Sequence, residues 1–571
     1  VLLLYLVPGA LFVAVLALLV LRRRSVTFAA LAALVAVVVV GSTIVLPQWR
    51  NAAEGTPPYP TGTPLPADTE ERLHGTLYGR ARYWVYALDV LPQSVSTPQP
   101  GDAAPLLRPL IGYGPETYYL STQRYLPPEY RTNQIQGASF RDRPHNHYLY
   151  LALTTGVLGL GAWLALVASC GMILYRLLRR RGPPSGATLF ALAAGCAVTG
   201  FLSHAVFNPI AITEEGLLWT SLALLPAIAA LKTSQVPRED TPFDEVAGSA
   251  ASSRVRTLIA CVLVVGAIAG GILAVRNPIM AEKTIRDASM LASAGHSDAV
   301  FMYSRATELQ PQQPTYWAEL GGYAHNVAIS APEETKHTVL ELSQIAFRQA
   351  RDNEPLFVFW HLNLGDVLLY AHTSIDMVPV DDAMESYERA MELYPGSAVL
   401  AGRLALAQMV AGDHSAAALA LQRSSEYDPN WNRIPHLQAA LTALDGQGEV
   451  AARALAGLIH ESPRAILTFT QISTEQLHTY DLMDTVAAEM LPHLDAERED
   501  HAELALRGVL LALTGEPEEA AAALSAAMVA APEESAPAIM DAADRLARIV
   551  PGLRQALIAS QSALCLCPPY A

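Results

Sequence analysis

The sequence has few of the residues that build disulfide-stapled folds or metal centres. Only five of its 571 residues are cysteine. Cys170, Cys196 and Cys261 lie in apolar runs, where cysteine acts as a small hydrophobic residue. Cys565 and Cys567 have one residue between them, whereas zinc and redox pairs usually have two. We therefore expect no disulfide framework and no metal site.

The sequence also lacks the short motifs of common nucleotide, cofactor and hydrolase sites. It has no P-loop, nucleophile elbow or zinc motif, and Gly112-Tyr113-Gly114 lacks the third glycine and the preceding strand of a dinucleotide fingerprint. We expect no cofactor on this ground.

Basic residues are too few for a nucleic-acid-binding protein, because the chain carries a formal net charge of −16. Residues 1–275 hold 20 basic and 15 acidic residues, whereas the remainder holds 18 basic and 39 acidic residues. Nucleic-acid binding needs basic patches, so nucleic acid is excluded as a partner of the acidic part. The imbalance predicts two halves of different character.

The first half is dominated by apolar runs of the length that crosses a bilayer as a helix, about 20 residues. Six runs are expected to do so: Val1–Leu21, Thr27–Leu46, Tyr148–Tyr175, Ala187–Phe207, the shorter Leu217–Leu231 with Pro226, and Leu258–Val275. The chain begins inside such a run, so we expect it to lack an N-terminal portion. A buried core helix would explain one run but not six.

Basic residues set the orientation of these spans. Arginines follow the first and third runs, and Lys232 with three arginines follows the fifth, which marks those ends as cytoplasmic. The predicted order is two spans (1–46), an extracytoplasmic loop with the active site (47–147), three spans (148–231), a cytoplasmic linker (232–256), a span (257–276) and an extracytoplasmic repeat domain (285–571). The fold is thus expected to be all-α, a multi-pass bundle followed by a solenoid.

The acidic half repeats a pattern of alanine, a large residue, alanine and proline. Ala383, Tyr387, Ala390 and Pro395 show it, and the prolines at 395, 429 and 463 are 34 residues apart. That period and these residue types match the tetratricopeptide repeat, in which small residues let two antiparallel helices approach. Around 464–510 the pattern fades, which predicts a degenerate or different helical unit there. Such arrays bind protein partners, so we expect a protein partner for this domain.

The predicted loop 47–147 has nine arginines and no lysine. A guanidinium grips phosphate oxygens with two parallel hydrogen bonds, which an ammonium cannot do. Solvated surface charge explains most of these arginines. Four flank apolar or aromatic segments and are the candidates for anion binding: Arg80, Arg82, Arg141 and Arg143.

The order of short motifs around this loop resembles the C-terminal region of the O-antigen ligase and polymerase family of bacterial membrane glycosyltransferases. The motifs are Arg80 four residues before Trp84, then Gly112 and Gly114, then His145-Asn146, and finally a glycine pair in the following apolar run. The resemblance covers roughly residues 1–231, and each motif is short. A tetratricopeptide domain is familiar in such proteins.

The resemblance implies transfer of a glycan from an undecaprenyl-diphosphate carrier to an acceptor hydroxyl of a glycan, lipid or protein, outside a bacterial inner membrane. Arg80 and Arg143 would hold the diphosphate, and His145 would act as general base or orient the phosphates. Asn146 would fix the histidine or a sugar, and Gly112 and Gly114 would help to shape the substrate site.

Two other functions stay open. A membrane-anchored, non-catalytic scaffold would use the repeats to recruit cell-envelope partners. A transporter is disfavoured because the spans have few charges and no matched pair of broken helices.

Overall fold

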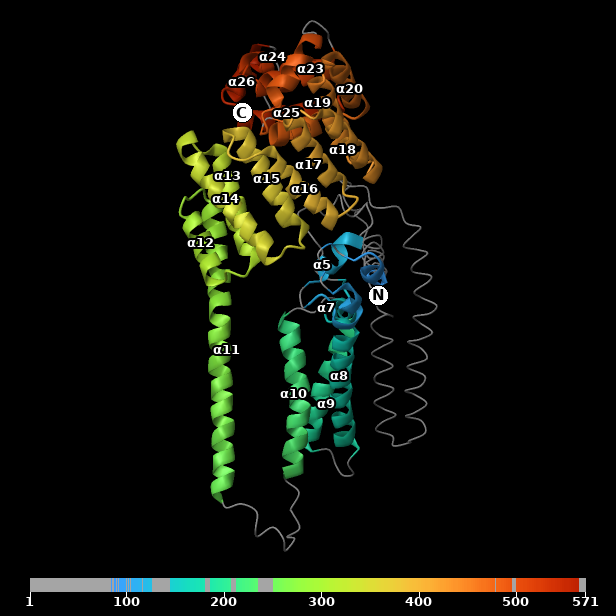
Figure 1. Ribbon diagram of the computed structural model, residues 1–571, viewed down its shortest axis with the longest axis vertical. Helices are drawn as coiled ribbons and strands as arrows, with labels where there is room; N and C mark the ends of the chain where they lie inside the picture. Colours follow the sequence, from blue (N-terminus) through green and yellow to red (C-terminus); the bar gives the residue numbers. More distant parts are fainter. Residues whose placement is uncertain are drawn as a thin grey trace. The chain divides into compact units, whose positions relative to one another are not determined.

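A computed structural model describes residues 84–125 and 144–234 with gaps, and residues 250–477, 479–494 and 500–563. These residues form helices and connecting turns, with no strand among them (Figure 1). The all-α prediction is therefore confirmed over the described ranges. The two predicted spans in 1–46, together with Arg80, Arg82, Arg141 and Arg143, lie outside them.

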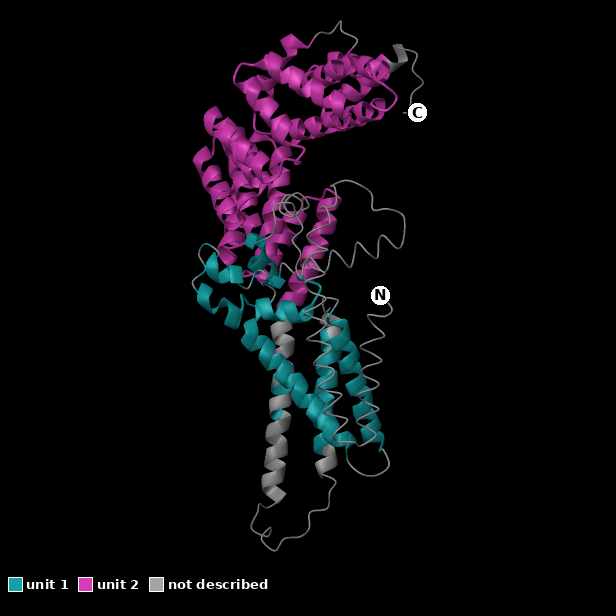
Figure 2. Ribbon diagram, turned by 90° about the vertical axis from the view of Figure 1, so that its right-hand side faces the viewer, with its two compact units in different colours: residues 1–126, 139–268 teal, residues 127–138, 269–571 magenta. Residues whose placement is uncertain are grey.

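The chain divides into two compact units, coloured separately in Figure 2. One comprises residues 1–126 and 139–268, and the other comprises residues 127–138 and 269–571.

The first unit has a short-helix region followed by longer apolar helices. Its described helices are η1 (Pro105–Leu107), α4 (Arg108–Ile111), α5 (Tyr118–Thr122), η2 (Gln123–Tyr125), α7 (His147–Thr154), α8 (Gly156–Leu178), α9 (Gly186–His204) and α10 (Ile212–Ser234).

Helices α8, α9 and α10 share one apolar core. Trp163 and Cys170 of α8, Ala191 and Ala194 of α9, and Leu225 of α10 are all buried in it. Outward-facing residues of the same helices are apolar and exposed: Val157, Leu158, Leu164, Leu166, Met172, Leu189, Phe190, Leu217 and Trp219. The core is thus a thin seam, and much of the apolar surface of these helices packs against nothing in the described chain.

Among the described helices, two are long and apolar enough to cross a bilayer, α8 and α9. Within α10 the apolar stretch Glu215–Ala230 is shorter. The assignment of α8 and α9 as possible membrane spans rests on helix length and composition alone.

The run Tyr148–Tyr175, predicted as one continuous helix, is broken after Thr154. The carbonyls of Leu153 and Thr154 accept hydrogen bonds from the backbone N–H groups of Tyr113 (3.2 Å) and Gly114 (2.7 Å). Gly156 has a φ of +69°, which a right-handed helix does not contain. The prediction of a single helix was wrong because backbone N–H groups 40 positions earlier in the sequence bind the carbonyls at the break.

Helix α11 (Ala250–Ser293) is 44 residues long and continues through Pro278. It contains the whole predicted span 257–276, and the boundary between the two units falls within it. Its last turns pack with the second unit, where Ala288 of α11 is buried with Tyr303 and Leu320.

The second unit is a series of antiparallel helix pairs (Figure 1). Its helices up to the fourth pair are α12 (Ala299–Leu309), α13 (Pro314–Ser330), α14 (Glu333–Asn353), α15 (Val358–Ile375), α16 (Val380–Leu393), α17 (Ala398–Val410), α18 (His414–Tyr427), α19 (Ile434–Leu444) and α20 (Gly448–Glu461). The pattern resumes with α23 (His501–Leu513), α24 (Pro517–Ala530), α25 (Ala536–Ile549) and α26 (Leu553–Ala563).

A glycine on the first helix of a pair admits a ring from the second. A Cβ at Gly321 of α13 would lie 2.8 Å from the ring of Phe347, and one at Gly365 of α15 would lie 2.6 Å from the ring of Tyr387. The alanines of the sequence repeat are fully buried in the same seams, as Ala383 and Ala390 show. Small residues therefore set the close approach of paired helices.

Between α20 and α23 lies a segment of different structure, residues 462–499, here called the insert. It contains α21 (Ala465–Ile472), the π-helix η4 (Ser473–Leu477), α22 (Met483–Met490) and η5 (Leu491–His493). Its described part coincides with the stretch where the repeat pattern of the sequence fades.

Candidate functional site

Two regions bear on function: the predicted transferase motifs of the first unit and a cavity in the repeats of the second. In the first, Gly112 and Gly156 form a backbone crossing. Each has a φ of +69°. A Cβ at Gly112 would collide with the backbone of Thr154, and one at Gly156 would collide with the backbone of Leu110. Glycine is needed at both positions because two backbones touch there.

The neighbouring motif residues start α7. Asn146 caps this helix, since its side-chain oxygen accepts a hydrogen bond from the Leu149 N–H at 3.0 Å. His145 precedes it with a φ of +53°, a conformation that non-glycine residues rarely adopt. Gly114 faces the Thr117 side chain, 3.6 Å from where its Cβ would be. The described motif residues thus have visible structural roles, and their roles in chemistry stay predictions.

Arg108 is one of the nine arginines of the predicted loop, and its guanidinium is already engaged. It pairs with the fully buried Asp102 at 2.6 Å and donates to the Gly112 carbonyl at 3.1 Å. It also lies 4.8 Å from the ring centre of Tyr113. This arginine therefore stabilises the turn around Gly112.

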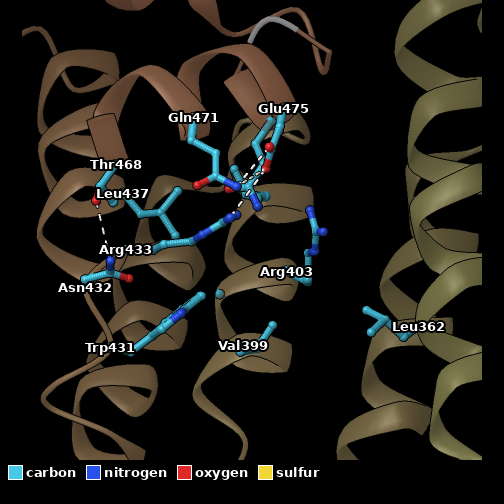
Figure 3. Close-up of a pocket in the computed structure, with 13 residues that line it drawn as sticks. Leu362, Val399, Arg403, Trp431, Asn432, Arg433, Leu437, Thr468, Gln471 and Glu475 are labelled. Carbon is cyan, nitrogen blue, oxygen red and sulfur yellow. Dashed lines mark hydrogen bonds and ion pairs between the residues drawn. The ribbon is translucent and has the colours of Figure 1, made fainter. Parts of the chain in front are cut away.

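A cavity of about 490 Å³ opens among the first helices of three repeat pairs and the insert (Figure 3). Helices α15, α17 and α19 supply one side, and α21 with η4 supplies the other. Its polar lining residues are Arg403, Asn432, Arg433, Thr468, Gln471, Glu475 and Gln476. Sequence analysis did not single out any of them. Arg403 is the only charged residue of α17, a signal that was present in the sequence.

Two guanidiniums lie at the centre of this cavity. With its amide turned to satisfy both, Gln476 accepts hydrogen bonds from Nη1 of Arg403 at 3.1 Å and Nη1 of Arg433 at 3.0 Å. Arg403 also lies 3.5 Å from Asp366, and Arg433 lies 3.4 Å from Glu475. Figure 3 shows Arg433 extending toward Gln471 and Glu475, with Arg403 on the adjacent helix.

The two arginines differ in electrostatic setting. Burial alone lowers the pKa of Arg403, but Asp366 together with Tyr480, Tyr387 and Glu475 outweighs this and raises that pKa above its usual value. Burial lowers the pKa of Arg433, Glu475 only partly offsets this, and the positive charges of Arg403 and Arg545 lower it further. The carboxylates near Arg433 therefore do not fully balance the positive charge of its buried guanidinium.

Asp366 is bound from two sides. The Tyr387 hydroxyl donates a hydrogen bond to its Oδ1 at 2.7 Å, while Arg403 faces its Oδ2. Both tyrosines near this carboxylate, Tyr387 and Tyr480, have raised pKa values because they are buried and near its negative charge. The Asp366 carboxylate thus binds groups of the protein itself and holds the Arg403 side chain in place.

Trp431 adds an aromatic wall to the cavity. Its indole packs on α17, where a Cβ at Gly402 would lie 2.6 Å from the ring. The side chain is 5% exposed, and within the described residues its buried indole N–H donates to no acceptor. The cavity therefore offers a guanidinium with spare hydrogen-bonding capacity beside an aromatic surface. It suits a ligand that brings oxygen acceptors and negative charge.

Residues 380–444 match the tetratricopeptide repeat family. This match confirms the repeat prediction for α16 to α19, including Pro395 and Pro429. No curated protein matches the chain in sequence. The structure is similar to the crystal structure of yeast Tom70, with 11% identity, 84% of this chain and 95% of that chain covered, and a TM-score of 0.26. A likeness at that score carries no inference about this protein.

Proposed function

We propose that the repeat domain is a protein-interaction module that binds a partner segment carrying a carboxylate in the cavity around Arg433. One observation carries the proposal. Arg433 lines the cavity together with Arg403, and its contact to Glu475 is 3.4 Å, long for a charge-assisted hydrogen bond of about 2.8 Å. A ligand carboxylate placed there would gain two parallel hydrogen bonds.

The rest of the cavity is consistent with a peptide ligand. The Asn432 and Gln471 amides have both donors and acceptors for a peptide backbone. Leu362, Val399 and Leu437 give apolar contact for side chains of such a segment. Leu362, Val399 and Leu437 lie on the first helices of neighbouring pairs, so one extended segment would contact several repeats.

A peptide panel tests this directly. Fluorescence anisotropy on the purified full-length chain compares labelled acidic peptides, ending in aspartate or glutamate, with matched peptides in which each acid is replaced by its amide. We expect the acidic peptides to bind more tightly and to lose affinity as salt rises. Equal affinity of the acidic and amide peptides would refute the carboxylate assignment.

Variants separate the cavity from general attraction. Arg433→Gln removes a charge-assisted contact worth about 1.5–3 kcal/mol, which corresponds to roughly a tenfold to hundredfold loss of affinity. Arg453→Gln is the matched control, because Arg453 lies on α20 outside the cavity, is 76% exposed and pairs with Glu449 one turn earlier. Equal affinity losses in both variants would show nonspecific electrostatics.

As a second candidate we propose that the first unit is the membrane-embedded part of a lipid-linked glycan transferase in the inner membrane of a bacterium. The donor would be an undecaprenyl-diphosphate glycan, and the acceptor a hydroxyl of a glycan, lipid or protein. The specific support is the Gly112–Gly156 crossing, which brings two of the motifs together at the start of α8. The exposed apolar residues of α8 to α10 suit a lipid environment.

The test of this second candidate is transfer from a purified lipid-linked oligosaccharide to an acceptor. His145→Ala is expected to abolish transfer while the membrane level of the protein stays unchanged. His204→Ala, at the end of α9, serves as a comparison for a general loss of structure. Full transfer activity in His145→Ala would remove the assigned role.

A further inference from the structure

Three metal-ligating side chains meet where the insert joins the repeats. His460 lies in the last turn of α20, Asp500 caps the start of α23, and His501 is the first residue of α23. His460 and Asp500 lie on either side of the insert, 40 positions apart in the sequence, and no residue of the cluster lines the cavity around Arg433. This cluster is therefore distinct from the site described above.

The geometry of the cluster is close to that of a metal site. Nε2 of His460 lies 3.0 Å from Oδ2 of Asp500, and the His460 and His501 rings lie edge to face with their centres 4.9 Å apart. One ligand atom from each residue lies within 4.8 Å of the others. Ligands on one tetrahedral zinc ion are about 3.3 Å apart for bonds of about 2.0–2.1 Å. Small side-chain rotations would close that difference.

The aspartate is oriented by its own helix. Its Oδ1 accepts hydrogen bonds from the backbone N–H groups of Ala502 at 2.9 Å and Glu503 at 3.1 Å. With Oδ1 bound in this way, Oδ2 is turned toward His460. Hydrogen bonds that fix a carboxylate in this manner are what hold metal ligands in position in proteins.

We propose that His460, Asp500 and His501 bind a divalent transition-metal cation of the zinc type, which joins the end of α20 to the start of α23. Two imidazole nitrogens and one carboxylate oxygen leave at least one coordination position for water, as a three-ligand zinc site does. The ion would fasten together the two ends of the insert.

Isothermal titration of the metal-free, untagged full-length chain with zinc chloride is the primary test. We expect one site per chain, with affinity lowered at least tenfold in His460→Ala and in His501→Ala. His414→Ala is the matched control, because His414 pairs with Asp445 at 2.6 Å on the same array but joins no group of three metal-ligating side chains among the described residues. Unchanged zinc affinity in His501→Ala, or no zinc binding by the wild-type chain, would overturn the proposal.

Two further measurements guard against misfolded variants and the wrong class of ion. Asp500→Asn keeps a side chain that caps helices well but has no charge, so α23 should start normally while zinc affinity falls. Calcium chloride should bind more weakly than zinc, because calcium prefers all-oxygen sites. Tighter binding of calcium, or full zinc affinity in Asp500→Asn, would contradict the ligand set.

The structural effect can be read separately from affinity. Zinc should slow amide hydrogen exchange in η5 and the first turn of α23 in the wild-type chain but not in His501→Ala. Zinc binding with no change in exchange at these helix ends would contradict the fastening role.

Discussion

The glycine at position 321 allows a sharp test of how the repeats pack. Gly321 lies on α13 at its closest approach to α14. A Cβ there would be 2.8 Å, 2.9 Å and 3.1 Å from three ring atoms of Phe347, a residue that is 3% exposed. Favourable carbon–carbon contacts lie at about 3.5–4.0 Å, so Gly321→Ala forces the ring back by roughly half to one ångström.

The magnitude follows from two opposing effects. Overpacking a buried seam costs about 1–3 kcal/mol, and the Phe347 ring is enclosed by the paired helices. Replacing a helical glycine with alanine contributes about 1 kcal/mol in the opposite direction. The net change in the free energy of unfolding for Gly321→Ala should therefore run from near zero to a loss of about 2 kcal/mol.

The next residue supplies the control. Gly322 is on the same helix, and a Cβ there would meet nothing within 4 Å. Gly322→Ala should keep the gain in helix propensity without the clash, and so stabilise the chain by up to about 1 kcal/mol. The free energies of unfolding of the two variants should thus differ by about 1–3 kcal/mol, with Gly322→Ala the more stable.

Thermal unfolding of the full-length chain in detergent, followed by far-ultraviolet circular dichroism, measures this difference. One kcal/mol corresponds to roughly 2–4 °C in melting temperature for a domain of this size. Gly321→Ala should melt below Gly322→Ala, and Phe347→Leu in the Gly321→Ala background should recover part of the loss by giving the new methyl group space. Equal melting temperatures for the two alanine variants would refute the packing described for α13 and α14.

Three other outcomes are expected. Gly156→Ala should lower the melting temperature far more than Gly161→Ala, because a Cβ at the first collides with the Leu110 backbone while a Cβ at the second meets nothing within 4 Å. Tyr387→Phe should cost about 1.5–3 kcal/mol, measured by denaturant unfolding, because it removes the hydroxyl donor to a carboxylate and leaves that carboxylate with one partner fewer. Burial lowers the pKa of His436, so on acidification the unfolded chain binds this proton at a higher pH than the folded chain does. The free energy of unfolding should therefore stay constant above a pH of about 6.5 and decrease below it, by up to about 1.4 kcal/mol per pH unit. The decrease should be smaller in His436→Gln.

Local sequence patterns predicted the repeat fold because they report contacts made between adjacent helices. The spacing of Ala383, Tyr387, Ala390 and Pro395 reflects one helix pair, and those residues are buried or end a helix in the structure. The loss of the pattern after Pro463 coincides with a π-helix and short helices. Because each helix pair makes similar contacts, the same residue types recur at a regular spacing, and this spacing can be recognised in the sequence.

The break at Thr155 and the cavity around Arg433 could not be read in this way. The break depends on hydrogen bonds from Tyr113 and Gly114, which lie far away in the sequence. The cavity depends on which face of α17 and α19 turns toward the insert, and no period of one helix specifies that. A single arginine in an otherwise uncharged helix, Arg403, was the one local sign of it.

The insert also changes how the repeat array is expected to unfold. In a simple solenoid each repeat touches only its neighbours, so single repeats can open independently from the ends. Here α21 packs against α25, although α22, α23 and α24 come between them in the chain. That contact closes a loop of helices, so α21 to α25 should gain or lose structure as one cooperative block, whereas α13 to α18 remain a row of separable units. Mechanical pulling from the C-terminus should show this as one large extension step, reached only after α26 has peeled away.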